Sequence, residues 1–219
     1  MVSGIIVAAG KGSRMGADIN KVFLKLAQKT VIEYTLDAFE KCADIDETIL
    51  VISRDDEKRC KELEKKYPDL KIVFGGAQRK DSVLNGINAA SGDVVVIHDG
   101  ARALITPELI SKVVSDGKKY EAATLGVPSK DTVKIINDEK IVEQTPNRTY
   151  VYQTQTPQVF SKKLIKEAHE ANKNEIATDD ASLVEMYGKK VKMTEGSYEN
   201  IKITTPEDLL LAEEIVKRR

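Results

Sequence analysis

The chain has 219 residues, and its 34 Lys and Arg residues nearly balance 35 Asp and Glu residues, for a formal net charge of −1. This balance excludes a non-specific nucleic-acid binder, because such proteins need a basic excess. No apolar run reaches the roughly 18 residues of a membrane span, and the start lacks the charged region of a signal peptide. With two Cys and two His residues, neither a disulfide framework nor a histidine-based zinc site is expected. We therefore expect one cytoplasmic domain over 1–219.

Short apolar runs alternate with helical patterns along the first half of the chain. The runs typical of strands cover 4–9, 48–53, 70–74, 93–98 and 122–127. Helices are predicted over 30–42, 54–67 and 79–90, and after Thr106-Pro107. Continuous apolar runs are typical of strands that are buried on both faces. The alternation predicts an α/β fold whose mainly parallel sheet is covered on both faces by helices.

The alternation stops after Val127. Extended segments at 132–136 and 141–144 flank the turn 137–140, which predicts a hairpin. The pattern alone leaves open whether this hairpin rests on its own domain, rests on another subunit, or is a solvated decoration. Beyond it, the sequence predicts helices over 161–172 and 181–187, an extended segment over 191–194, a strand over 200–205 and a last helix that begins at Thr205-Pro206.

A glycine-rich loop, 8–16, follows the first strand. Such a turn can direct backbone N–H groups at a phosphate. The loop is not a P-loop, because it lacks a Gly-Lys-Ser/Thr at the required spacing, and Met15 occupies the third glycine position of the dinucleotide fingerprint. Its cations Lys11 and Arg14, together with Lys21, suit a triphosphate. The alternative is a plain tight turn with surface cations.

Two further loops follow strands and carry polar groups. The Gly-Gly pair at 75–76 allows a ligand to approach the backbone closely, and Ser82 offers a hydroxyl on the next helix. Asp99 and Arg102 follow the fourth strand, where they could hold a hydroxyl or a metal-bound group and an anion. An ordinary capped turn and a local Asp–Arg pair are the respective alternatives. We interpret His98 as structural, because it continues a buried strand.

The carboxyl ends of parallel strands meet at one edge of a sheet, and ligands bind there in open α/β folds. All three loops follow strands, so we expect them to gather around one site. Lys202 lies within the apolar segment 200–205 and is expected to point towards the same edge. The alternative is a strand whose alternate face is solvated.

The motifs, taken together, resemble a known family. They are Ala-Ala-Gly-x-Gly-x-Arg-Met at 8–15, Gly-Gly-x-x-Arg-x-x-Ser-Val at 75–83, His-Asp-Gly-Ala-Arg at 98–102, Lys-Asp-Thr at 130–132, Gln-Thr-Pro-Gln-x-Phe at 155–160, Thr-Asp-Asp-Ala-Ser at 178–182 and Asn-Ile-Lys-Ile-Thr-Thr-Pro-Glu-Asp-Leu at 200–209. In this order they resemble the 2-C-methyl-D-erythritol 4-phosphate cytidylyltransferase family of the non-mevalonate isoprenoid route. The resemblance implies a Rossmann-like three-layer nucleotidyltransferase fold, in which 130–150 is an inserted β-hairpin dimerisation arm that lies across a two-fold partner in a homodimer.

The resemblance also implies a reaction: transfer of CMP from CTP to 2-C-methyl-D-erythritol 4-phosphate, with Mg²⁺ held mainly through the CTP phosphates and by no dedicated protein site. The implied catalytic residues are Arg14, Lys21 and Lys202. The implied CTP-binding residues are Ala8, Ala9, Gly10, Gly12, Gly75, Ser82, Asp99 and Ala101. The implied sugar-phosphate contacts are Arg102, Thr132, Arg148 and Thr156, of which Thr132 and Arg148 would serve the neighbouring subunit.

Two departures from the family pattern concern loop rigidity. Many members have Pro where this chain has Asn20, and Pro where it has Ala103, so these loops are expected to be less restrained. The nearest alternative function is that of a ribitol-5-phosphate cytidylyltransferase, whose members usually lack the patterns at 130–132 and 179–182. A catalytically silent nucleotide-binding protein is the alternative from another class, and the retained charged residues argue against it.

Overall fold

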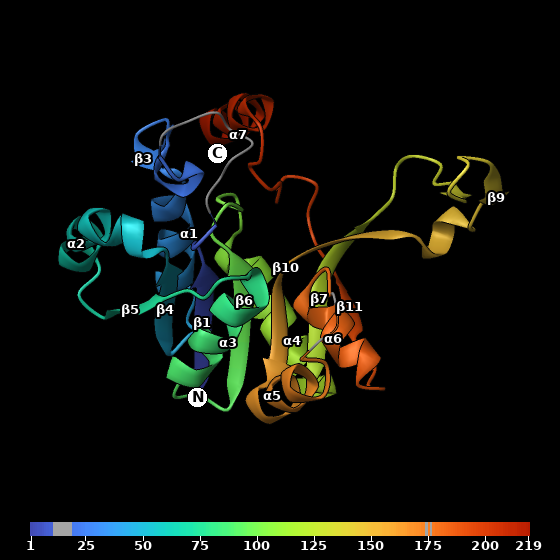
Figure 1. Cartoon of the computed structure of the whole chain (residues 1–219). Helices are drawn as coiled ribbons and strands as arrows, with labels where there is room; N and C mark the ends of the chain where they lie inside the picture. Colours follow the sequence, from blue (N-terminus) through green and yellow to red (C-terminus); the bar gives the residue numbers. More distant parts are fainter. Residues whose placement is uncertain (11–18, 174, 176) are drawn as a thin grey trace.

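The structure is a computed structural model that describes residues 1–10, 19–173, 175 and 177–219. Its centre is a seven-stranded sheet in the order β11-β7-β10-β6-β1-β4-β5 (Figure 1). The strands are β1 (Val2–Val7), β4 (Glu47–Ile52), β5 (Leu70–Phe74), β6 (Val94–Asp99), β7 (Ala122–Pro128), β10 (Tyr152–Ser161) and β11 (Lys192–Glu195). Only β10 runs antiparallel to its neighbours among these described strands. The prediction of a mainly parallel sheet is confirmed.

Helices cover both faces of this sheet. The helices α1 (Val31–Glu40), α2 (Glu57–Lys66) and α4 (Pro107–Tyr120) share one apolar cluster with the sheet, and α3 (Arg79–Ala89), α5 (Lys162–Ala171) and α6 (Asp180–Met186) share another. Ile6 belongs to the first cluster and Ile5 to the second, because successive side chains of a strand point to opposite faces. The three-layer arrangement follows. In the described part of the chain, no helix is long and apolar enough to cross a membrane.

A third apolar cluster lies at the carboxyl edge of the sheet. It joins α7 (Pro206–Arg218) to the short pair β2 (Lys25–Leu26) and β3 (Lys29–Thr30) through Leu26, Leu104, Ile203 and Ala212. The start of α7 is fixed locally, because Thr205 and Asp208 form a capping box. This cluster holds the segment before α7 against the edge at which the predicted site lies.

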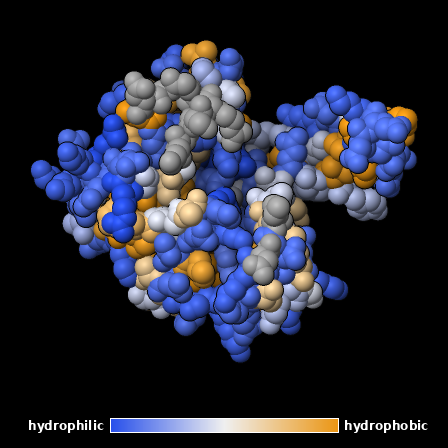
Figure 2. Space-filling model, in the orientation of Figure 1, coloured by the Kyte–Doolittle hydropathy of each residue, from blue (hydrophilic) through white to orange (hydrophobic). Residues whose placement is uncertain are grey.

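The hairpin projects from the body of the molecule (Figure 1). It contains β8 (Ile135–Ile136), β9 (Val142–Gln144) and the turn η4 (Arg148–Tyr150). Both strands are shorter than the sequence predicts, since an isolated two-stranded ribbon has no further strand to support it. Its apolar side chains are exposed, among them Ile136 at 50% and Val142 at 53%, and Figure 2 shows this apolar surface on the arm.

Two elements differ from the sequence-based expectation. The sequence-based expectation assigns no element to 152–161; the structure forms β10 there, with a register shift between Thr154 and Gln158 around Pro157, which cannot donate to a sheet ladder. The predicted strand over 200–205 is wrong, because this segment is extended coil that Ile203 ties to the Ala101 carbonyl by a 2.9 Å hydrogen bond.

Candidate active site

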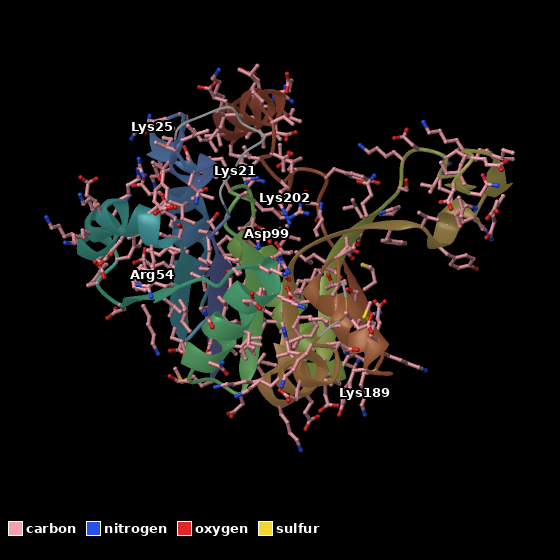
Figure 3. All side chains as sticks on the ribbon, viewed as in Figure 1. Lys21, Lys25, Arg54, Asp99, Lys189 and Lys202 are labelled. Atoms are coloured by element: carbon pink, nitrogen blue, oxygen red, sulfur yellow. The ribbon has the colours of Figure 1, made fainter. Side chains whose placement is uncertain are left out.

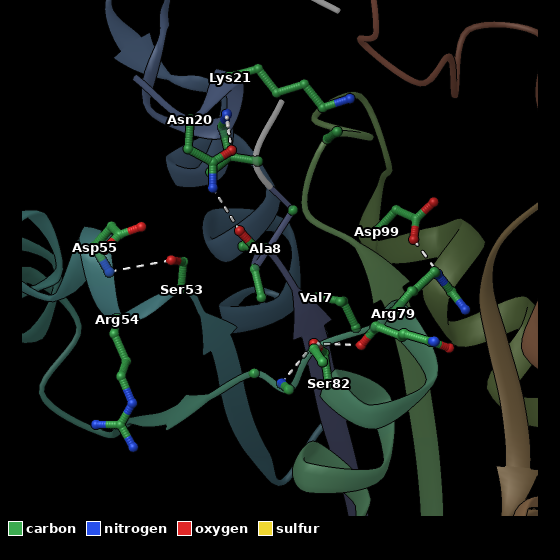
Figure 4. Close-up of a pocket in the computed structure, with 18 of the residues that line it drawn as sticks. Val7, Ala8, Asn20, Lys21, Ser53, Arg54, Asp55, Arg79, Ser82 and Asp99 are labelled. Atoms are coloured by element: carbon green, nitrogen blue, oxygen red, sulfur yellow. Dashed lines mark hydrogen bonds and ion pairs between the residues drawn. The ribbon is translucent and has the colours of Figure 1, made fainter. Parts of the chain in front are cut away.

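Four neighbouring strands end level with one another. Val7 of β1 pairs with Val51 of β4 and Asp99 of β6, and Ile52 of β4 pairs with Phe74 of β5. The loops that follow these strands surround a cleft of about 600 Å³ (Figure 4). A cleft of this size at the carboxyl edge suits a small-molecule ligand.

The cleft brings together most of the residues that the family resemblance assigns to CTP and catalysis. Those that line it are Ala8, Ala9, Gly10, Lys21, Gly75, Ser82, Asp99, Ala101 and Lys202. Lys11, Gly12 and Arg14 lie outside the described residues. Lys21 and Lys202 therefore line the same cleft, although they are distant in sequence. Figure 3 labels both lysines above Asp99.

One wall of the cleft is a narrow polar corner between Ala9 and Ser82. The Ser82 hydroxyl is buried, donates to the Gln78 carbonyl at 3.1 Å and accepts from the Gly76 N–H at 3.1 Å. A Cβ at Gly75 would lie 2.6 Å from both the Ser82 Oγ and the Ala9 Cβ. Glycine is required there, because a Cβ would clash with both Ser82 and Ala9.

A charge cluster forms another part of the cleft wall. Asp99 accepts from Lys202 Nζ at 2.7 Å and from Arg79 Nη2 at 3.4 Å, and Arg79 also donates to Asp180 at 2.9 Å. Burial alone would raise the pKa of Asp99, but Arg79 and Lys202 together outweigh burial, so this pKa lies well below its usual value. Asp99 is therefore ionised and holds Lys202 at the cleft.

The roles of Arg79 and Asp180 were not predicted from the sequence. Both residues occur in the recognised motifs, but no pattern shows that they meet, because 101 positions separate them. Gln78 and Arg54, which also line the cleft, have no sequence signal beyond their position after a strand.

His98 braces the loop that carries Asp99. The backbone N–H of Asp99 donates to the Thr156 Oγ1 at 3.0 Å, and this hydroxyl lies 3.0 Å from the His98 Nδ1. Burial lowers the pKa of His98 to about 4, so a neutral ring accepts the Thr156 proton, and its Nε2–H faces the Arg102 carbonyl at 3.3 Å. The fully buried side chain agrees with the structural interpretation of His98.

The residues assigned to the sugar phosphate lie elsewhere. The Arg102 guanidinium donates to the backbone carbonyl of Asn200 at 2.7 Å, and Thr156 is only 5% exposed. Thr132 and Arg148 are exposed on the arm, where Arg148 donates to the Lys130 carbonyl at 3.1 Å. None of these four residues lines the cleft of its own chain in the described structure.

The donor atoms of the cleft fit a particular kind of metal site. Among the described residues, no group of three or more His, Cys, Asp or Glu side chains could enclose an ion. Asp55 and Asp99 are the carboxylates in the described lining, and both oxygens of Asp99 have cationic partners. This set fits Mg²⁺ that keeps most of its ligands as water and phosphate oxygens.

Comparison with known proteins decides the family. The profile described as "IspD: 2-C-methyl-D-erythritol 4-phosphate cytidylyltransferase" matches residues 2–218. The chain belongs to this family. The family resemblance drawn from the motifs is thus confirmed, and the chain is a CTP-dependent nucleotidyltransferase.

Named relatives support the same assignment over the full length. A 2-C-methyl-D-erythritol 4-phosphate cytidylyltransferase of Caldanaerobacter subterraneus subsp. tengcongensis is 46% identical over 225 residues, which cover 99% of each chain. The crystal structure of 4-diphosphocytidyl-2C-methyl-D-erythritol synthase from Anaerococcus prevotii superposes with a TM-score of 0.90 at 40% identity, covering 99% of this chain and 98% of that chain. The Thermus thermophilus 2-C-methyl-D-erythritol 4-phosphate cytidylyltransferase gives a TM-score of 0.81 at 31% identity, covering 99% of this chain and 100% of that chain.

Proposed function

We propose that this cleft transfers CMP from CTP to 2-C-methyl-D-erythritol 4-phosphate, yielding 4-diphosphocytidyl-2-C-methyl-D-erythritol and pyrophosphate. The observation that carries the proposal is the convergence of Lys21, Lys202 and Asp99 with the Gly75–Ser82 corner on one cleft, in a chain of the cytidylyltransferase family. The cytosine lies against the Gly75–Ser82 corner, where backbone groups are accessible. The ribose lies at Asp99 and Ala101, and the triphosphate lies along the loop after β1.

The reaction is an in-line displacement at the α-phosphorus of CTP. An oxygen of the acceptor phosphate forms the new P–O bond while the bond to pyrophosphate breaks, and the electron pair leaves with pyrophosphate. The attacking oxygen is already ionised near neutral pH, so the protein needs no general base. Repulsion between the two anions is the main obstacle, and Lys21 and Lys202, with Arg14, offset it by positioning and charge.

Mg²⁺ fits this cleft as an ion carried by the nucleotide. When bound, it neutralises part of the triphosphate charge. Asp99 is engaged in its ion pairs with Lys202 and Arg79, so phosphate oxygens and water would supply most of the ligands of the ion.

The arm supports a homodimer with a shared site. It exposes Ile135, Ile136, Ile141 and Val142, and such an apolar surface on a projecting hairpin indicates a protein contact. Thr132 and Arg148 lie on the same arm, away from their own cleft. In a two-fold dimer with exchanged arms they would meet the acceptor phosphate of the neighbouring subunit.

Pyrophosphate release tests the substrate assignment. The purified chain with CTP and Mg²⁺ is offered 2-C-methyl-D-erythritol 4-phosphate, D-ribitol 5-phosphate or no acceptor. We expect release with the methylerythritol phosphate and almost none with the others. Preferred turnover of ribitol 5-phosphate would establish the alternative cytidylyltransferase, and CTP binding without release for any acceptor would show a silent nucleotide-binding protein.

A further inference from the structure

The residue before Lys21 makes a set of contacts that the sequence does not reveal. Asn20 is 8% exposed, and its side-chain amide donates to the Ala8 carbonyl at 2.7 Å and to the Asp56 carboxylate at 2.9 Å. Its side-chain oxygen accepts from the Val22 N–H at 3.4 Å. Both amide hydrogens and the oxygen of Asn20 are thus engaged within the protein.

These contacts connect three segments at the rim of the cleft. Ala8 directly follows β1 and lines the cleft, and its own N–H donates to the Val51 carbonyl of β4 at 2.8 Å. Val22 belongs to η2 (Lys21–Phe23), the single turn that carries Lys21, and Asn20 is its N-cap. Asp56 ends the turn η3 (Arg54–Asp56), which precedes α2.

Asp56 is itself fixed in place. It is 4% exposed, its N–H donates to the Ser53 carbonyl at 3.1 Å, and its second carboxylate oxygen lies 3.3 Å from Arg59 Nη1. A buried carboxylate that accepts from an amide forms a stronger hydrogen bond than a neutral acceptor does. Asp56 therefore orients the Asn20 amide towards Ala8.

The turn η2 has little rigidity of its own. It contains three residues, and an isolated turn of that length is not stable in water. The contacts of Asn20 fix the start of η2 relative to the end of β1, and Figure 4 shows the Lys21 side chain extending from there towards the side of the cleft where Asp99 lies. A shift of the turn would move the ammonium group directly.

We propose that Asn20, oriented by Asp56, is a positioning residue that fixes Lys21 relative to the cleft residues that are proposed to bind CTP. The inference rests on the proposed function for the role of Lys21. It removes the expectation of a less restrained loop, because a side-chain network supplies the restraint that a proline ring supplies elsewhere. The backbone supports this equivalence: Asn20 has φ −59°, close to the value that proline imposes.

Three variants test the proposal by steady-state kinetics with CTP and 2-C-methyl-D-erythritol 4-phosphate. Asn20→Ala removes the network and should lower kcat by roughly 10- to 100-fold with little change in the KM for CTP, since misplacement of a catalytic group affects the reacting geometry. Asn20→Pro restores the restraint by another route and should recover most of that loss. Asp56→Ala should lower kcat in the wild-type background but not in the Asn20→Pro background.

A matched control separates positioning from stability. Asn172 also donates its side-chain amide to two backbone carbonyls, those of Ala168 at 2.9 Å and Leu183 at 3.3 Å, between α5 and α6 and outside the described cleft lining. Asn172→Ala should lower the unfolding temperature while kcat stays at the wild-type value. The proposal is wrong if Asn20→Ala behaves like Asn172→Ala, or if Asp56→Ala lowers kcat equally in both backgrounds.

A crystal structure of Asn20→Ala gives a readout that does not depend on turnover. We expect a displaced or weakly ordered η2 with an unchanged β1, whereas an unchanged η2 would overturn the proposal. If the wild-type chain shows no turnover, the proposed function is refuted but the role of Asn20 is not. The position of η2 in the crystal structure of Asn20→Ala would still test that role.

Discussion

The two lysines of the cleft are fixed by different means. Lys202 lies on extended coil and is held through its side chain by the ion pair with Asp99 at 2.7 Å. Lys21 lies on a short turn whose backbone is fixed by the residue before it. A charge on a backbone-fixed stem is preorganised, and preorganised charge gives strong transition-state stabilisation.

Replacement of Lys21 by alanine should mainly affect the chemical step. We expect kcat to fall on the order of 10²–10³-fold, because the charge of this lysine matters most as negative charge develops on the transferring phosphate. The KM for CTP should change far less. Steady-state kinetics provide the measurement, and Lys25→Ala, an exposed lysine outside this cleft, is the control. Wild-type turnover in Lys21→Ala would exclude its catalytic role.

The sequence identifies some site residues and not others for a physical reason. Gly75, Ser82 and Asp99 could be predicted because each belongs to a motif that follows a strand, and the topology brings these loops together. The contact of Arg79 with Asp180 depends on the packing of two helix starts, which no local pattern encodes. The contacts of Asn20 depend in the same way on tertiary structure.

Among the secondary-structure elements, the apolar pattern of the sequence predicts those strands and helices whose side chains pack into the core. The parallel strands were found because a strand buried on both faces must be a continuous apolar run. The strand β10 was missed because its sequence contains Pro157 and several Gln and Thr residues and so has no continuous apolar run. The polar side chains find hydrogen-bond partners that are distant in sequence: Gln158, for example, donates to Asp179 at 2.7 Å. The hairpin was found from its turn, but its short strands reflect the absence of a supporting layer.

The arm should contribute to acceptor binding and not to CTP binding. Arg148→Ala is expected to raise the KM for 2-C-methyl-D-erythritol 4-phosphate with little change in CTP affinity, because the arginine would contact the acceptor phosphate of the partner. Kinetics with varied acceptor and a CTP-binding titration measure the two effects. Lys134→Ala removes another cation of the arm and serves as the control. A loss of CTP affinity in Arg148→Ala would show that the arm does not lie at the acceptor phosphate.

For the whole molecule, the net charge of −1 conceals a local excess of positive charge. The described lining of the cleft contains Lys21, Arg54, Arg79 and Lys202 against the carboxylates Asp55 and Asp99. Two highly anionic substrates can therefore be attracted to one edge of a chain whose remaining surface carries the compensating acids. Cations concentrated in a cleft focus the field where substrate binds.

Subunit mixing tests whether the site is shared. Lys21→Ala and Arg148→Ala chains, each impaired alone, are unfolded together and refolded as a mixture. Random pairing makes half of the dimers mixed, and each has one intact cleft, so about a quarter of the wild-type activity should return. Separately refolded chains form the control. Activity that stays at the mean of the two parents would show that each cleft uses its own arm.

The strand β10 has a mechanical consequence for the proposed dimer. Its residues at 152–154 are exposed where the arm returns to the body, whereas Val159 and Phe160 are fully buried between β6 and β7. The register shift between these two parts contains Thr156, whose hydroxyl accepts from the Asp99 N–H. A force on the arm therefore acts along a strand that is anchored in the core and that contacts the Asp99 backbone through Thr156. In the proposed dimer, contact between the arm and a second subunit would therefore act on the backbone that carries Asp99.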